Sequence, residues 1–158
     1  MQKPLTEKRL ENIALFYLER FETSVEKLRQ VLKRRVSRQK MQGIMVNPDV
    51  SEWIENVISK MQRQGFVNDD RYVENAVRRM SEQGKSVRMI QQKLKAEGVD
   101  ASVVNRQIEM VDDLTQAKIF VRKKHLKPDE KDLAKLARAG FDYETAKQAL
   151  YQQEMEDV

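Results

Sequence analysis

Apolar residues recur every three or four positions in two short blocks within residues 65–99, and Gly84 separates the two blocks. This spacing places the apolar side chains on one face of a helix, so each block predicts an amphipathic helix. Polar side chains suited to capping a helix N-terminus precede both blocks, at Asn68–Asp70 and at Ser86. Gly98 follows the second block, where a left-handed residue commonly ends a helix. The stretch therefore predicts a helical hairpin.

The pattern of this hairpin occurs twice more in the chain. Residues 7–35 align without gaps on residues 69–97, and this register pairs Leu32 with Leu94. A second overlay without gaps, shifted by 42 positions, places Leu94 on Leu136. Because the two alignments share the same central segment, they predict three related units.

We expect each unit to contain three helices. The predicted units are residues 1–67, with an insertion loop at 37–48, then 68–111, and then 112–158, which ends in a frayed C-terminal tail. Only five glycines and three prolines interrupt the 158 residues, a composition that suits long amphipathic helices. The expected fold class is all-α, with about nine helices as tandem three-helix repeats in an extended or curved array.

Local signals predict how several helices begin. Thr6 precedes the first apolar stripe, and the pairs Thr23–Glu26 and Asp49–Glu52 have the spacing of capping boxes. Residues at both ends of the chain, 1–5 and 154–158, are expected to be frayed or disordered.

Apolar stripes also predict which side chains of the flanking units face inward. The expected positions in the first unit are Leu10, Ile13, Ala14, Tyr17, Leu18, Phe21, Val25, Leu28, Val31, Leu32, Trp53, Ile54, Val57, Ile58 and Met61. Those near the C-terminus are Leu133, Leu136, Ala137, Tyr143, Ala146, Ala149 and Leu150.

Composition restricts the class of protein. The chain has no cysteine, so disulfides and thiolate chemistry are excluded, and a reducing cytoplasmic location is expected. No apolar run approaches the roughly 20 residues that cross a membrane, and no signal peptide opens the sequence.

Positive charge is concentrated toward the N-terminus and around the central hairpin. Residues 1–67 carry 13 basic and 8 acidic residues, whereas 68–111 carry 8 and 7, and 112–158 carry 9 and 10. Two groups are candidate partner-binding residues: the N-terminal cations Lys33, Arg34 and Arg35, and the hairpin cations Arg78, Arg79, Lys85 and Arg88. Such strips suit phosphates or an acidic protein groove, although a solvated helix face is the plainer interpretation. That plainer interpretation is favoured for residues 122–127, because acidic residues follow closely.

A catalytic function is not supported by the residue types present. His125 is the only histidine and lies within a basic tract. Asp69 and Asp70 are explained as helix caps, and a metal-dependent nuclease needs carboxylates from several elements. The glycines are scattered helix stops and form no phosphate-binding loop. We therefore expect no enzyme activity, no metal and no cofactor.

The central segment reads GFVNDDRY, followed by the glycine-basic turn QGKSVRMI and the ending LKAEGV, and the chain later reads GFDYETAKQAL. These motifs resemble the RecX family of bacterial recombination regulators, and the last of them suits the family's third unit. The resemblance implies a small all-helical protein that binds the RecA recombinase filament in its groove and lowers its ATPase and strand-exchange activities. Contact with DNA would then be indirect or weak.

The residues leave two other functions open. A helical DNA-binding module acting without RecA is compatible with the helical hairpins and a sequence pI of about 9.4. A protein-binding adaptor is common among helical repeat arrays. Under the RecX interpretation, the hairpin cations are expected to hold the protein on the filament, with the N-terminal cations as the next candidates.

Overall fold

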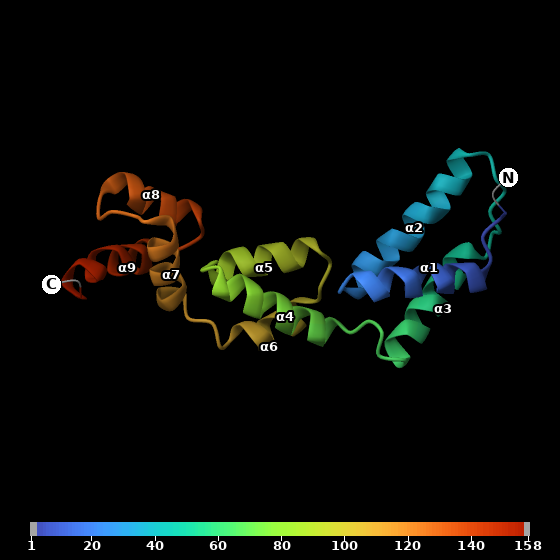
Figure 1. Cartoon of the computed structure of the whole chain (residues 1–158), viewed down its shortest axis with the longest axis horizontal. Helices are drawn as coiled ribbons and strands as arrows, with labels where there is room; N and C mark the ends of the chain where they lie inside the picture. The colour runs from blue at the N-terminus through green and yellow to red at the C-terminus, as the bar shows by residue number, and fades with distance from the viewer. Residues whose placement is uncertain (1–2, 157–158) are drawn as a thin grey trace. The chain divides into compact units, whose positions relative to one another are not determined.

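The computed structural model describes residues 3–156, and these residues form nine α-helices and no strand (Figure 1). In chain order the helices are α1 Glu7–Arg20, α2 Val25–Met41, α3 Val50–Arg63, α4 Asp69–Glu82, α5 Val87–Ala96, α6 Ala101–Ile108, α7 Asp113–Lys124, α8 Glu130–Arg138 and α9 Tyr143–Glu156. The described part of the chain is therefore all-α and built of three-helix repeats, as predicted.

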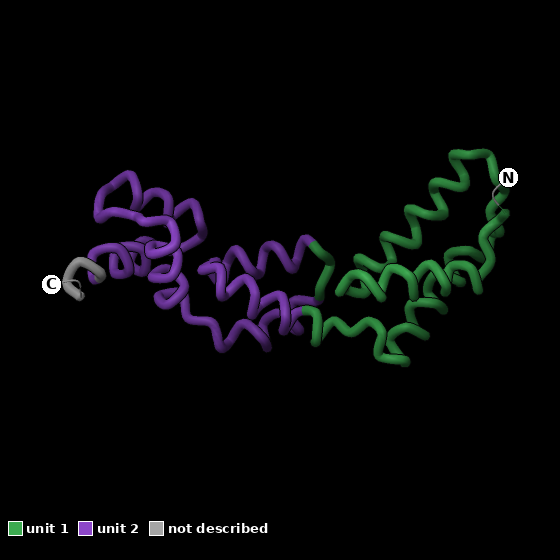
Figure 2. Tube along the Cα trace, in the orientation of Figure 1, with its two compact units in different colours: residues 1–72, 97–99 green, residues 73–96, 100–158 purple. Residues whose placement is uncertain are grey.

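The chain divides into two compact units, which are coloured separately in Figure 2. Unit 1 contains residues 1–72 together with 97–99, and unit 2 contains residues 73–96 and 100–158. This division places the turn that follows α5 in unit 1 and the body of α4 and α5 in unit 2.

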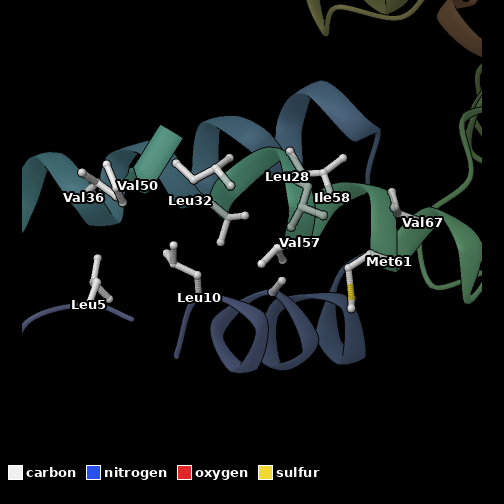
Figure 3. Close-up of a cluster of buried hydrophobic side chains, with 12 residues drawn as sticks. Leu5, Leu10, Leu28, Leu32, Val36, Val50, Val57, Ile58, Met61 and Val67 are labelled. Carbon is white, nitrogen blue, oxygen red and sulfur yellow. The ribbon is translucent and has the colours of Figure 1, made fainter. Parts of the chain in front are cut away.

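The core of unit 1 is formed by α1, α2 and α3. Figure 3 shows side chains from the three helices pointing toward one another, among them Leu10, Leu32 and Ile58. Leu10 and Leu32 are completely buried, and Ile58 is 2% exposed. Side chains at helical spacing on three helices thus close one apolar core, as the stripes predicted.

Unit 2 holds a second set of buried side chains. Leu94 of α5 and Leu136 of α8 are both completely buried, as is Leu32 in unit 1. In the C-terminal part, α9 packs against α7 and α8. The leucine that recurs through the sequence repeat is therefore a core residue each time.

Helix α2 is longer than the sequence predicted. The prediction of an insertion loop at 37–48 is therefore wrong for the first part of that range, which is helical. The helix continues to Met41, and only residues 42–49 connect it to α3. Gln39 is buried on this extension. Because the buried side chain at position 39 is polar, the added part of the helix has no apolar stripe from which it could be predicted.

The same glutamine fixes the N-terminal segment, which we had expected to be frayed. The Gln39 side chain accepts a hydrogen bond from the Leu5 N–H at 3.1 Å and donates one to the Lys3 carbonyl at 3.0 Å. Leu5 is 4% exposed and belongs to the unit 1 core. Met1 and Gln2 lie outside the described residues.

The frayed C-terminal tail also differs from the prediction. Helix α9 continues through Glu156, so residues 154–156 are helical. Asp157 and Val158 lie outside the described residues.

Neither predicted capping box forms. The N-cap of α2 is Ser24, whose hydroxyl accepts from the Lys27 N–H at 3.1 Å, whereas Glu26 pairs with Arg29. Asp49 stands at the N-cap of α3 but makes no side-chain capping hydrogen bond. The T-x-x-E spacing missed the true cap by one residue, because Thr and Ser are adjacent and both can cap.

Three positions expected to face inward are exposed: Phe21, Ala137 and Tyr143. Phe21 follows the last residue of α1 and Tyr143 is the first residue of α9, so the helical periodicity does not fix which way their side chains point. Ala137 lies within α8 beside the buried Leu136, and only Leu136 is on the buried face. Phe21 is extended, with φ −132° and ψ 127°.

Candidate partner-binding surface

The hairpin cations surround a turn that is held by buried polar contacts within unit 2. Ser86, the residue before α5, is completely buried and accepts a hydrogen bond from the Met89 N–H at 3.1 Å. Its hydroxyl donates to the carbonyl of Ala139 at 2.8 Å. Ser86 therefore caps α5, as predicted, and also ties it to the end of α8.

Two residues of α7 complete this attachment. The Asp113 carboxylate accepts from the Val87 N–H at 2.8 Å. The buried Gln116 amide donates to the carbonyls of Ser81 and Lys85, at 2.7 and 3.1 Å. These bonds hold the backbone on both sides of the turn, so Lys85 and its neighbours project from a fixed base.

Close packing explains the glycine at the end of α8. Gly140 has φ +99°, and a Cβ added there would lie 2.6 Å from Ser86 Oγ and 3.6 Å from Arg88 Cβ. Only a residue without a side chain lets the α8–α9 turn approach the start of α5 this closely.

The four hairpin cations differ in their surroundings. Arg78 is exposed and pairs with Glu74, its neighbour one turn away, at 3.3 Å. Arg79 and Arg88 are exposed, and Lys85 is half-buried. Exposed ion pairs contribute little to stability, so the pair with Glu74 leaves Arg78 able to exchange partners.

The structure brings Lys85 together with two lysines of the basic tract at 122–127. A hollow of about 390 Å³ is lined by Lys85 from the α4–α5 turn and by Lys123 and Lys124 from the last turn of α7, with Met89 and Phe120 also in its wall. Lys123 Nζ donates to the Glu82 carbonyl at 2.7 Å.

An adjoining hollow of about 340 Å³ shares two residues, Phe120 and Lys124, and adds Lys135 and Arg138 from α8. No acidic side chain lines either hollow in the described chain. We call these five residues, Lys85, Lys123, Lys124, Lys135 and Arg138, the lysine surface.

Nearby acids had favoured a solvated interpretation of the tract at 122–127, yet two of them have structural partners. Asp129 caps α8 by accepting from the Asp132 N–H at 2.8 Å. Asp132 accepts from the Lys127 N–H at 2.7 Å and pairs with Lys135 at 3.2 Å. The bond from the Lys127 amide is the main reason that the pKa of Asp132 is lowered. The sequence did contain a signal that the lysines are less neutralised than they seem. Asp129 stands where it can cap a helix, and a capping carboxylate is not available as a partner for the lysines.

The N-terminal cations lie on α2 within unit 1, away in sequence from the hairpin. Lys33 and Arg34 are exposed and Arg35 is half-buried. One turn earlier, Arg29 pairs with Glu26 and with Glu55, the latter at 2.7 Å. The hydrogen bond to Glu55 is the largest cause of a raised pKa at Arg29. Arg29 therefore links α2 to α3, whereas Lys33 and Arg34 remain candidates for an outside partner.

Other chemistry has no support in the described residues. Within 3–156 no cluster of three His, Asp or Glu side chains is placed to hold a metal ion. His125 is exposed at the C-cap of α7, in a left-handed conformation with φ 52°. Across the same part of the chain, every helix is too short or too polar to cross a lipid bilayer.

Comparison with known proteins agrees with these observations. Residues 68–106 match the family model described as RecX, second three-helix domain. A protein of Myxococcus xanthus named Regulatory protein RecX is 36% identical over 157 residues, covering 89% of this chain and 83% of the relative. The chain belongs to the RecX family.

Further similar proteins extend the agreement over the chain. The Regulatory protein RecX of Agrobacterium fabrum is 31% identical, over 93% of this chain and 85% of its own length. The crystal structure of RecX from Lactobacillus salivarius has a TM-score of 0.71 and 19% identity, covering 96% of this chain and 97% of that one. At that identity the structural match shows the shared fold, and the sequence relatives show the RecX family.

Proposed function

We propose that this RecX-family chain is a regulator that binds the RecA–DNA filament and lowers its ATPase and strand-exchange activities in recombination and repair. Membership of the family carries the proposal, since the relatives over most of its length are named regulatory proteins. It acts in the cytoplasm, without a cofactor and without catalysis of its own.

The lysine surface and the hairpin cations are the contact that we propose for the filament. The hairpin cations flank the α4–α5 turn, whose backbone is held by Ser86, Asp113 and Gln116. Lys123 and Lys124 line a hollow together with Lys85 of that turn. A filament wrapped around DNA presents acidic groups and partly shielded phosphates, and clustered ammonium and guanidinium groups are attracted to both. The N-terminal cations are the second candidate contact.

Titration of the protein into a RecA ATPase assay on single-stranded DNA tests the function directly. The parent is expected to inhibit, and the variants Arg78→Glu/Arg79→Glu and Lys85→Glu/Arg88→Glu are expected to inhibit less. Lys131→Glu is a control for charge reversal outside the hollows, because Lys131 is exposed on α8 and lines neither of them. Circular dichroism checks that each variant is folded. A parent that leaves the ATPase unchanged contradicts the proposed function.

DNA binding without RecA is the alternative that the lysine surface favours. Binding through phosphates releases counterions, so the affinity for naked DNA would fall steeply with salt. A salt titration of binding to DNA alone, beside one with the RecA filament, separates the two functions. Tight binding to naked DNA with no preference for the filament supports the alternative.

A further inference from the structure

Helix α2 carries a run of positive charge that nearby acidic residues hardly neutralise. No Asp or Glu occurs between Lys27 and Pro48, and this stretch holds seven cations: Lys27, Arg29, Lys33, Arg34, Arg35, Arg38 and Lys40. Among the described residues, Arg29 is the only one of the seven with an ion pair, and it pairs with Glu26 and Glu55. Lys33 lies close enough to the same two carboxylates to help lower their pKa. The other cations of α2 are therefore available to a partner from outside the chain.

The exposed face of α2 consists almost entirely of side chains that bind phosphate. Its exposed residues are Lys27, Gln30, Lys33, Arg34, Ser37, Arg38, Lys40 and Met41. Their helical spacing places them along the side of α2 that is opposite the buried Leu28 and Leu32. Lys and Arg, together with Ser and Gln, are the side chains that commonly donate hydrogen bonds to phosphate oxygens in complexes with DNA.

The same face lacks what a protein partner would use. Within α2, all of whose residues the structure describes, no acidic or aromatic side chain is exposed, and Met41 at the last position is the one exposed apolar residue. The centre of a protein–protein interface is depleted of charge and enriched in aromatic residues. Surfaces that bind nucleic acid are polar and strongly positive. The side chains of this face therefore favour a nucleic-acid backbone over a protein.

Helix α2 is also longer than its counterparts in the other repeats. It has 17 residues, whereas α5 and α8 have 10 and 9. In the gapless overlay Arg34 aligns with Ala96, the last residue of α5, so the turns that carry Arg38 and Lys40 lie beyond the repeat. The hydrogen bonds of the buried Gln39 to the N-terminal segment hold these turns in place. The added turns thus present further cations from a fixed base.

The cations extend over a length that suits several phosphates. From Lys27 to Lys40 the helix rises about 20 Å, at 1.5 Å per residue. One strand of duplex DNA carries a phosphate about every 3.4 Å along the axis, so this length matches about five or six phosphates. The helix dipole favours cations only near the last turn, and it does not account for Lys27 or Lys33.

We propose that Lys27, Lys33, Arg34, Arg38 and Lys40, here called the α2 strip, bind the phosphate backbone of DNA directly and without reading its sequence. The assignment goes beyond the proposed function, because it needs no RecA and rests on residues of unit 1 alone. A contact made only through phosphates is weak at physiological salt, with a Kd of about 10⁻⁴–10⁻⁶ M, so it is compatible with a preference for the filament.

The test uses the full chain with Arg34→Gln and Arg38→Gln together, because Gln has nearly the helix propensity of Arg but no charge. The matched control is Lys8→Gln with Arg63→Gln, which removes two charges from exposed positions on α1 and α3 of the same unit. Fluorescence anisotropy measures binding to a labelled duplex of about 20 base pairs at salt concentrations from about 50 to 200 mM.

The strip variant is expected to bind the duplex about tenfold more weakly than the parent at about 50 mM salt. The slope of log K against log salt concentration should become shallower by about two, because two phosphate contacts are lost. The control should keep the parental slope and bind within about twofold of the parent. If circular dichroism shows that the strip variant is unfolded, Lys33→Gln with Lys40→Gln replaces it, with the same expected change.

Several results would overturn the assignment. One is a parent that does not bind the duplex at the lowest salt concentration, and another is a strip variant with the parental affinity and slope. Equal losses in the strip variant and the control would show that only net charge matters. Competition by poly-L-glutamate as strong as that by unlabelled DNA of equal charge would assign the strip to an acidic protein surface instead.

Inhibition of the RecA ATPase, measured on the same proteins, keeps this assignment separate from the proposed function. A parent that binds the duplex through the α2 strip but leaves the ATPase unchanged supports the strip and refutes the proposed function. A parent that inhibits the ATPase but does not bind the duplex refutes the strip and supports the proposed function.

Discussion

Asp113, the first residue of α7, accepts a hydrogen bond from the first helical N–H of α5, that of Val87, at 2.8 Å. Within unit 1, Asp69 accepts from the Val25 N–H at the same distance. In each case an aspartate at the start of one repeat satisfies an amide at the N-terminus of the preceding repeat's second helix.

The contact around each aspartate is also repeated. Ser24 donates its hydroxyl proton to the Glu97 carbonyl at 3.4 Å, as Ser86 does to that of Ala139 at 2.8 Å. The residue after each carbonyl is a glycine, Gly98 or Gly140, that packs against the start of the preceding repeat's second helix. The repeat in the sequence thus encodes a repeated polar junction as well as repeated helices.

The junction predicts a specific loss when its aspartate is removed. Asp113→Ala should lower the free energy of unfolding by about 1 kcal/mol, because the Val87 amide loses its partner. Asp113→Asn keeps an acceptor oxygen and should recover most of the loss. Denaturant unfolding measures stability, and faster hydrogen exchange at Val87 would localise the effect. Equal stability of the alanine and asparagine variants would contradict the assignment.

Two glycines of unit 1 allow the cost of close packing at the junction to be separated from the cost of a left-handed backbone. Gly65 and Gly98 have nearly the same φ, +76° and +79°, but a Cβ added at Gly65 meets nothing within 4 Å. At Gly98 it would lie 2.5 Å from Glu26 Cγ and 2.8 Å from Glu26 Cβ. Gly65→Ala should cost about 1–2 kcal/mol from the left-handed backbone alone.

Gly98→Ala should cost more than Gly65→Ala, because it adds the contact with Glu26. Shortening the neighbour by Glu26→Ala should return part of the difference in the Gly98→Ala background, since the Cγ atom is then absent. Urea unfolding of the parent and these three variants provides the comparison. An equal loss of stability in Gly65→Ala and Gly98→Ala would show that the close approach to Glu26 adds nothing to the cost at Gly98.

The recurring leucine provides a test of the core. Leu94 is completely buried, so Leu94→Ala should cost about 2–5 kcal/mol through lost burial and a residual cavity. Met110 is 91% exposed, and Met110→Ala should change stability by less than about 0.5 kcal/mol. Denaturant melts of the two variants measure the contrast.

The sequence predicted those features that depend on periodicity and on local backbone rules. Leu32, Leu94 and Leu136 recur in register and are buried, and Gly98 has the left-handed conformation expected of a helix stop. The sequence did not predict that Gln39 is buried, because a buried polar residue is recognised only when its distant partner, the Lys3–Leu5 backbone, is known.

The candidate site was predictable in part for a similar reason. Lys85 could be selected from the local cluster of charge, but Lys123 and Lys124 follow it by more than 30 positions. Their convergence on one hollow depends on how α7 packs beside the α4–α5 turn. The capping role of Asp129 could have been inferred, whereas the contact distances needed the fold.

Protonation of the aspartates that cap helices should make the protein less stable in acid. The hydrogen bond from the Thr115 hydroxyl, with that from the Thr115 N–H, lowers the pKa of Asp112 below its ordinary value of 3.8, and Thr145 lowers the pKa of Asp142. A lowered pKa in the folded state means that the stabilisation is complete above pH 3.8 and is lost as the pH falls through the folded value.

Asp112→Asn should therefore be less stable than the parent near neutral pH, and the difference should shrink below about pH 4. Measuring unfolding free energy from pH 7 to pH 2 tests this sign. A difference that is constant across the range would show that the Asp112 charge is not part of the cap.

The lysine surface gives the last prediction. Lys123→Glu with Lys124→Glu reverses two charges on one wall of the larger hollow, and should weaken inhibition of the RecA ATPase about as much as Lys85→Glu with Arg88→Glu. The physical reason is that both pairs act on one surface, so combining all four changes should add less than the sum of the two effects. Lys131→Glu, with the same kind of charge change outside the hollow, should inhibit as the parent does. The measurement is the protein concentration that gives half-inhibition, with circular dichroism to confirm that each variant is folded. Strictly additive effects would mean that the two pairs contact separate parts of the partner. Parental inhibition by the Lys123/Lys124 variant would remove α7 from the contact, and parental inhibition by both double variants would place the contact on the N-terminal cations instead.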